Sequence, residues 1–175
     1  MRLFIALEFN ELKKYFYSLQ DKIRFNSGKF TFPKTFHMTL KFIGEFDENK
    51  VEIVKKILEK VKFEKISVKV SKIGFFPTEK YIRVVWIGIK PEEEIIKLQS
   101  RIDKELEELN FKQEKSFKPH ITLARVKVLQ EKEEFVEKVK NLVIEEKEIT
   151  LKSFKLVKSE LTPEGPVYED LGEFS

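Results

Sequence analysis

Apolar residues recur along the chain with two periods, which predict strands and amphipathic helices in turn. The apolar run at residues 2–8 predicts a buried strand, and apolar positions three or four residues apart predict a following helix that Asn10 caps. Residues 36–43 predict a second strand, and a helix capped by Asp47 is expected over the apolar positions between 51 and 61. The chain therefore begins with two strand–helix units.

A closing pair of strands ends the first half of the chain, and the same order of elements then begins again. Strands are expected at 66–76 and 81–89, followed by a helix with Pro91 in its first turn. The later elements are a strand at 119–126, a helix near 131–142, and strands at about 148–158 and 166–174. This weak internal duplication predicts a single bilobal α+β domain over residues 1–175, in which each lobe contributes one copy of the motif described below.

The composition is typical of a soluble globular protein, with 41% hydrophobic and 37% charged residues. The chain has no cysteine, which excludes disulfides, thiolate nucleophiles and thiolate metal sites. The apolar run at the N-terminus is too short for a signal peptide or a membrane span, so we expect a cytoplasmic protein without a membrane partner. A net charge of +4 permits a polyanionic partner without requiring one.

The only two histidines of the chain both begin the tetrapeptide His-x-Thr-Leu, at His37 and His120. A chance repeat at both histidines has a probability on the order of one in 100,000. Both tetrapeptides fall in predicted strands, where side chains alternate between faces, so each histidine projects beside its threonine, Thr39 or Thr122. The pair predicts a site in which both motifs act together.

Two histidines suit a reaction that needs one proton donor and one proton acceptor. Imidazole titrates near pH 6.5, so one ring can be charged while the other is neutral, and each supplies about 100- to 10,000-fold through proton transfer. The hydroxyls of Thr39 and Thr122 can donate hydrogen bonds to the oxygens of a phosphate held between the rings. A strained cyclic phosphodiester fits such a site, and we expect no metal and no cofactor.

Other kinds of site find little support in the sequence. A zinc site needs three or four ligands, and two histidines without cysteine would require carboxylates that show no ligand spacing. The chain contains neither the Gly-x-Ser-x-Gly turn of serine hydrolases nor the glycine-rich loop that binds nucleoside triphosphates.

With these motifs the chain resembles the 2H phosphoesterase superfamily, and within it the RNA 2′,3′-cyclic phosphodiesterases historically called 2′-5′ RNA ligases. The strings that carry the resemblance are RLFIA at 2–6, FHMTLKFIG at 36–44, the turn at Phe76-Pro77, VVWIG at 84–88, FKPHITLARV at 117–126 and SELTPEGPVY at 159–168. Paired His-x-Thr motifs define the superfamily, and the flanking strings point to this branch.

The resemblance implies a bilobal fold with pseudo-twofold symmetry, in which two antiparallel sheets face a central groove and the helices lie outside. It implies that His37 is the general acid that protonates the departing O3′ and that His120 is the general base that activates water. Thr39 and Thr122 would hold the phosphate. The implied substrate is RNA with a 2′,3′-cyclic phosphate end, including tRNA fragments, and the product is a 2′-phosphomonoester. We expect the enzyme to act as a monomer.

Two further positions complete the pattern. Phe42 lies five residues after His37, and Arg125 lies five residues after His120. Arg125 matches an arginine of the family that approaches the phosphate, but strict alternation places it on the face opposite His120, so this role requires a bulge in the strand. The alternative is a surface or structural ion pair. Alternation likewise places Phe42 with Met38 on the packing face as a core residue, and the alternative is a base-stacking residue.

Residues 25–34 are expected to form a loop, and the cations Arg24, Lys29 and Lys34 lie beside Phe30 and Phe32 there. Such a mixture suits RNA phosphates and bases, although a charged loop more often contacts only water. The reverse reaction, 2′-5′ ligation of RNA ends, uses the same acid–base pair. An alternative function is a non-catalytic module that binds RNA ends or nucleotides.

Overall fold

The computed structural model describes all residues from 1 to 175, and its strands and helices follow the predicted order closely. In chain order the strands and α-helices are β1 (Arg2–Glu8), α1 (Lys13–Ile23), β2 (Gly28–Thr31), β3 (His37–Glu45), α2 (Val51–Leu58), β4 (Ile66–Thr78), β5 (Tyr81–Lys90), α3 (Glu93–Leu106), β6 (Ile121–Leu129), α4 (Lys132–Lys140), β7 (Glu148–Leu151), β8 (Phe154–Thr162) and β9 (Gly165–Phe174). No helix is long and apolar enough to span a membrane.

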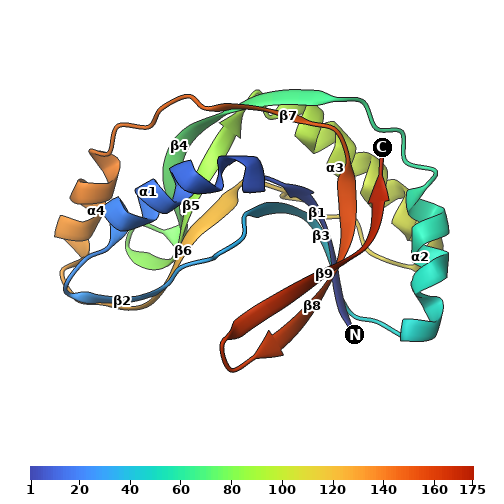
Figure 1. Cartoon of the computed structure of the whole chain (residues 1–175), viewed down its shortest axis with the longest axis horizontal. Helices are drawn as coiled ribbons and strands as arrows, with labels where there is room; N and C mark the ends of the chain where they lie inside the picture. Colours follow the sequence, from blue (N-terminus) through green and yellow to red (C-terminus); the bar gives the residue numbers. More distant parts are fainter.

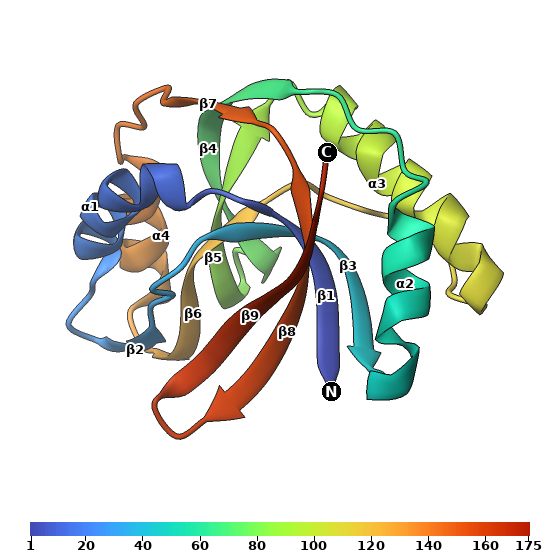
Figure 2. The ribbon, with the colours of Figure 1, turned by 45° about the vertical axis from the view of Figure 1, so that its right-hand side comes forward.

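The strands form two antiparallel sheets, as predicted (Figure 1). Sheet A has the strand order β3-β1-β8-β9, and sheet B has the order β2-β6-β5-β4-β7. Helices α1 and α4 lie together beside sheet B, whereas α2 and α3 lie together beside sheet A (Figure 2). The helices thus cover the outer faces, and each sheet contains one of the two motif strands, β3 or β6.

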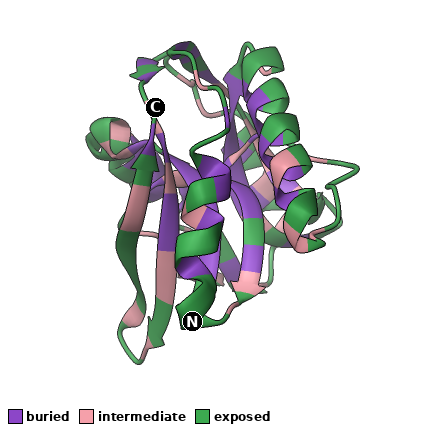
Figure 3. Cartoon of the chain, turned by 90° about the vertical axis from the view of Figure 1, so that its right-hand side faces the viewer, coloured by how far each residue is buried: buried purple, intermediate pink, exposed green.

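The two sequence repeats are exchanged between the two sheets. The hairpin β4–β5, from the first half of the chain, pairs with β6, and the hairpin β8–β9, from the second half, pairs with β1. Each motif strand is therefore in a sheet with strands from the other half, so the lobes cannot separate without unpairing a sheet. The outer part of β8–β9 projects from the body and is exposed or half-buried (Figure 3).

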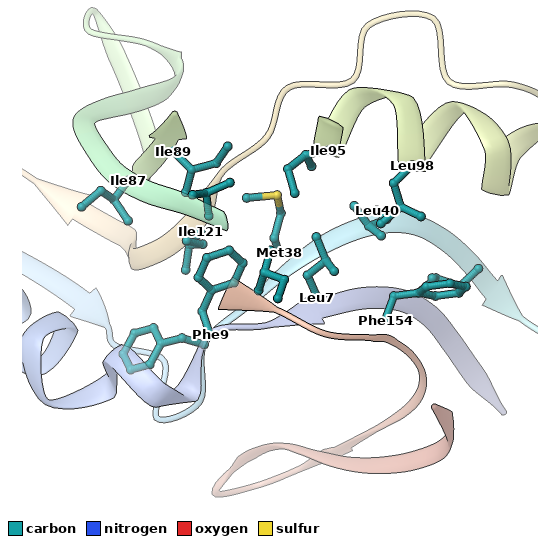
Figure 4. Packing of buried hydrophobic residues seen from close by; sticks show 14 of the residues in the cluster. Leu7, Phe9, Met38, Leu40, Ile87, Ile89, Ile95, Leu98, Ile121 and Phe154 are labelled. Atoms are coloured by element: carbon teal, nitrogen blue, oxygen red, sulfur yellow. The ribbon is translucent and has the colours of Figure 1, made fainter. Parts of the chain in front are cut away.

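One continuous core joins the two sheets. It contains 39 buried apolar residues, among them Leu7, Met38, Ile121 and Phe154, which come from both sheets (Figure 4). At roughly 1.5–3 kcal/mol for each fully buried large side chain, this shared core is the main favourable contribution to folding. The tetrapeptides contribute to it through the residues that alternate with the histidines and threonines.

Several predicted boundaries were wrong. Residues 148–158 form two strands, because β7 ends at Leu151 on the edge of sheet B and β8 begins at Phe154 in sheet A. The loop at 25–34 contains the short edge strand β2, whose four residues are too few to show a period. Helix α3 begins at Glu93, so Pro91 lies just before it.

The predicted helix cap at Asn10 is also wrong. No side chain caps the turn that precedes α1, and Asn10 Oδ1 instead accepts a hydrogen bond of 2.7 Å from the backbone N–H of Phe36. Asn10 therefore fixes the start of β3, one residue before His37, rather than the start of a helix. Asp47 does cap its turn, because its carboxylate accepts from the backbone N–H of Asn49.

Candidate active site

The His-x-Thr motif of β3 presents its two polar side chains on one face of sheet A. His37 and Thr39 are half-buried, whereas Met38 and Leu40 are buried against the helices. This alternation is the one that the sequence predicted. We call the side of the two sheets that bears His37, Thr39 and Thr122 the histidine face.

A β-bulge in β3 changes the alternation after the motif. In the pairing with β1, Leu40 has no partner residue, so Leu40 and Lys41 are both buried in succession. Phe42 consequently lies on the histidine face, where 72% of its surface is exposed. The prediction that Phe42 packs in the core was wrong, because strict alternation does not hold across a bulge.

Strand β6 has a bulge at the corresponding position, Leu123. Trp86 pairs with Thr122 and Val85 pairs with Ala124, which leaves Leu123 without a partner in β5. Leu123 and Ala124 are both fully buried, and Arg125 is exposed on the same face as Thr122. The bulge that Arg125 needs to reach the histidine face is therefore present, and Arg125 forms none of the salt bridges of the protein.

A buried glutamine supports the bulge of β6. Gln20 of α1 is 4% exposed, and its Nε2 donates hydrogen bonds to the carbonyl of Leu123 at 3.0 Å and to that of Pro33 at 2.9 Å. A bulge interrupts the ladder of backbone hydrogen bonds, and a buried carbonyl without a partner is costly. Gln20 supplies that partner and ties β6 to the segment that enters β3.

The bulge of β3 is supported by a buried ion pair. Lys41 Nζ lies 2.7 Å from the carboxylate of Asp103 in α3 and also donates to the carbonyl of Lys112. Asp103 accepts further hydrogen bonds from Gln99 and from the backbone N–H of Glu114. The network therefore anchors the segment between α3 and β6, which leads to His120.

His120 lies immediately before β6, which begins at Ile121, whereas the sequence predicted a strand from residue 119 that contains His120. Its Nδ1 is 2.7 Å from the carbonyl oxygen of Lys118, and a carbonyl only accepts, so Nδ1 carries the proton. In the neutral ring Nε2 is then the lone-pair nitrogen. The ring of Phe76 contacts His120 edge-to-face at 4.8 Å, which fixes its orientation further.

His37 is held by aromatic rings rather than by a backbone carbonyl. Its ring lies 4.9 Å from that of Phe4 and meets the ring of Tyr168 edge-to-face at 5.1 Å. Burial, together with the positive charge of Arg125, lowers the pKa of His37 to about 4, and Glu8 opposes this shift. Without a bound anion His37 is therefore neutral at pH 7.

Arg125 acts on both histidines. Burial lowers the pKa of His120, the hydrogen bond to Lys118 opposes the shift, and the charges of Arg125 and Lys118 lower it further. Burial raises the pKa of Tyr168, and Arg125 opposes that shift. The charge of one cation thus acts on both imidazoles and on the phenol, which suits a site that binds an anion.

Sequence reasoning missed some of these residues. Tyr168 belongs to the closing string that carried the family resemblance, but no role was assigned to it. Phe4 and Gln20 gave no signal, because each fits a strand or helix pattern equally well as a packing residue. The predicted loop at 25–34 also differs, since Phe30 packs against Phe135 at 5.5 Å and is half-buried, so it is not free to stack on a base.

Comparison with known families gives two matches in this chain. The model described as LigT like Phosphoesterase matches residues 7–86 and again residues 87–168, so each half resembles the same family unit. Among curated proteins, the RNA 2′,3′-cyclic phosphodiesterase of Methanocaldococcus jannaschii is 35% identical and covers 99% of this chain and 100% of its own length. The protein of the same name from Thermotoga maritima is also 35% identical, covering 99% of this chain and 94% of its own.

Solved structures agree with these sequence matches. TT0787 of Thermus thermophilus superposes with a TM-score of 0.83 at 31% identity, covering 100% of this chain and 97% of that one. The LigT protein of E. coli, solved in complex with 3′-AMP, superposes with a TM-score of 0.76 at 20% identity, covering 98% and 95%. The second likeness concerns the fold alone.

Proposed function

The chain belongs to the LigT-like phosphoesterase family, and from that premise we propose that it is an enzyme that hydrolyses RNA 2′,3′-cyclic phosphate ends to 2′-phosphomonoesters. What supports this proposal is that the two motif strands, β3 and β6, contact each other and that the charge of Arg125 lowers the pKa of both histidines. Two imidazoles beside one cation suit acid–base chemistry on a bound phosphate.

The proposed reaction consumes one water molecule. Water attacks phosphorus and gives one proton to Nε2 of His120, while the bond between phosphorus and O3′ breaks. His37 donates a proton to the departing O3′, so the product carries a 2′-phosphate and a 3′-hydroxyl. The two rings end with exchanged protonation, which solvent restores.

The surroundings of the rings support this division of labour. The hydrogen bond from Nδ1 to Lys118 leaves Nε2 of His120 as a proton acceptor, which suits a general base. His37 has a lowered pKa and is therefore a strong acid once it is protonated. The negative charge of a bound phosphate offsets that of Arg125 and favours protonation of His37.

The remaining residues bind in this proposal. Thr39 and Thr122 donate hydrogen bonds to the non-bridging oxygens, and Arg125 neutralises the charge that accumulates on them. Phe42 stacks on the terminal base, for which its 72% exposure leaves room. The same groups could join a cyclic end to a 5′-hydroxyl, but water at ~55 M favours hydrolysis unless the two ends are held together. We include fragments of cleaved tRNA among the proposed substrates.

The test is incubation with a 2′,3′-cyclic nucleotide and with a cyclic-phosphate-ended RNA, followed by separation of the 2′- and 3′-phosphate products. A 2′-phosphate product supports the proposal, and a 3′-phosphate product would overturn the assigned leaving group. His37→Ala and His120→Ala should each lower turnover by about 100- to 10,000-fold while RNA binding persists. An inactive wild type that loses RNA affinity in these variants would instead support a binding module.

A further inference from the structure

The two sheets differ in their charged residues. The strands of sheet A contain six acidic residues against four Lys or Arg, and all four cations form salt bridges. The strands of sheet B contain seven Lys or Arg against a single acidic residue, Glu148 on the edge strand β7. Only one of the seven, Lys90, has a carboxylate partner, which is Glu146. Sheet B therefore carries positive charge that the protein itself does not neutralise.

Four of these unpaired cations gather at one end of sheet B, on strands β2, β5 and β6, which contain no acidic residue. They are Lys29, Arg83, Arg125 and Lys127. All four are exposed. We call Lys29, Arg83 and Lys127 the basic strip.

The strand register places the basic strip on the histidine face, and Lys29 belongs there because the next residue, Phe30, packs against Phe135 of α4 on the opposite face. Val84, which follows Arg83, pairs with Arg125 across β5 and β6, and Arg83 is the extra residue where the β4–β5 pairing shifts, so it projects with Val84. Lys127 is likewise the extra residue where the β2–β6 pairing shifts, and it lies two positions beyond Arg125. Strand spacing then puts the strip within about 10 Å of Arg125.

From this placement, and resting on the proposed function, we propose that the basic strip binds the phosphates of an RNA strand on the 5′ side of the reacting end. The cyclic phosphate is the 3′ terminus, so every other phosphate lies in the 5′ direction. A chain that left the histidines over sheet A would meet Glu8 and Asp170, whose charges are already shared with Lys155. A chain that crosses sheet B meets cations that form no salt bridge within the protein.

The preferred substrate is then an oligonucleotide, because a mononucleotide has no preceding phosphates to contact the strip. The terminal nucleoside contacts the aromatic side of the site, at Phe42, and the preceding phosphates contact the strip. Because the strip extends only about 10 Å from Arg125, the benefit of a longer chain should end after roughly two or three added nucleotides.

The experiment compares kcat/KM for a 2′,3′-cyclic mononucleotide and for a five-nucleotide RNA with the same terminal nucleoside, at several salt concentrations. The variants are Arg83→Ala and Lys127→Ala, and Lys56→Ala on the outer helix α2 is the matched control. For the RNA we expect each strip variant to lose about 5- to 10-fold at low salt, and the slope against the logarithm of salt to fall by about 0.7 per side chain. For the mononucleotide we expect no change.

The outcomes separate this inference from the proposed function. A wild type that hydrolyses the mononucleotide and the RNA equally well, with equal salt dependence, overturns the strip while leaving the activity intact. An equal loss in the Lys56→Ala control, or an equal loss on both substrates, also overturns it. A wild type inactive on both substrates would instead contradict the proposed function. The two strip variants test the inference separately, so poor folding of one does not prevent a result.

Discussion

The two copies of His-x-Thr-Leu have the same sequence and equivalent bulges, but their histidines lie in different surroundings. His120 donates from Nδ1 to a backbone carbonyl and has Lys118 beside it, whereas His37 lies between the rings of Phe4 and Tyr168. Burial lowers the pKa of both, and that of His37 falls to about 4. The chemistry of each histidine therefore depends on the residues that surround it, because the two motifs share the same His-x-Thr-Leu pattern.

The largest expected effect comes from removing either histidine. His37→Ala and His120→Ala should each lower kcat on a cyclic mononucleotide by about 100- to 10,000-fold, since each deletes one proton transfer. Single-turnover rates on the same substrate would measure the loss, with RNA affinity as the control for folding. If one variant kept nearly full activity, the paired mechanism would be wrong.

A substrate whose leaving group needs no protonation would distinguish the roles of the two histidines. With a nucleoside 2′-phosphodiester in which a group that departs as a stable anion replaces O3′ on phosphorus, His37→Ala should recover activity and His120→Ala should not, because only the acid becomes dispensable. Recovery in His120→Ala instead would reverse the assigned roles.

The second effect concerns the cation that the two copies share. Arg125→Met should lower kcat/KM by about 100-fold, because a charge-assisted contact to the phosphate is lost. A positive charge disfavours the imidazolium, so its removal should raise the pKa of both histidines. The kcat/KM profile of the wild type should be bell-shaped with limbs below pH 6.5, and that of Arg125→Met should move to higher pH. The Lys56→Ala control should leave the profile in place, and an unshifted Arg125→Met profile would contradict the assignment.

Much of this site follows from the sequence, because the tetrapeptides are local patterns. Period-two alternation correctly separated His37 and Thr39 from Met38 and Leu40. The exposure of Phe42 on the histidine face could not be predicted in this way, because the bulge at Leu40 is set by pairing with β1 rather than by the motif. The bulge at Leu123 was foreseen only as a condition for Arg125.

The exchange of hairpins between the two sheets cannot be predicted from local sequence patterns, for a similar reason. Residues 148–158 have strand propensity throughout. The chain breaks between Leu151 and Phe154 because β7 joins sheet B whereas β8 joins sheet A. Gln20 is likewise a polar residue on a helix whose partner, the Leu123 carbonyl, is 103 residues away. Such contacts arise from the tertiary structure, which periodicity does not encode.

A third, smaller effect tests how the bulge of β6 is supported. Gln20→Leu leaves the carbonyl of Leu123 without its donor, so we expect Arg125 to lose its position and kcat/KM to fall by about 10-fold. A purely structural role would lower stability alone. The discriminating measurement is a double-mutant cycle, in which Gln20→Leu should cost little more in the Arg125→Met background. Additive losses would show that Gln20 does not act through Arg125.

The smallest expected effect on activity comes from replacing Tyr168, the aromatic neighbour of His37. This change is also the most selective, because it should alter the pKa of only one histidine. Tyr168→Ala opens the ring of His37 to water, so its pKa should rise from about 4 towards 6.5, while that of His120 stays in place. Tyr168→Phe keeps the ring and should move neither. Because the chain has two histidines, NMR titration of the imidazole Cε1–H signals resolves both, with His120→Asn to assign them. An unchanged His37 in Tyr168→Ala, or an equal rise in His120, would mean that the aromatic neighbours do not distinguish the two copies.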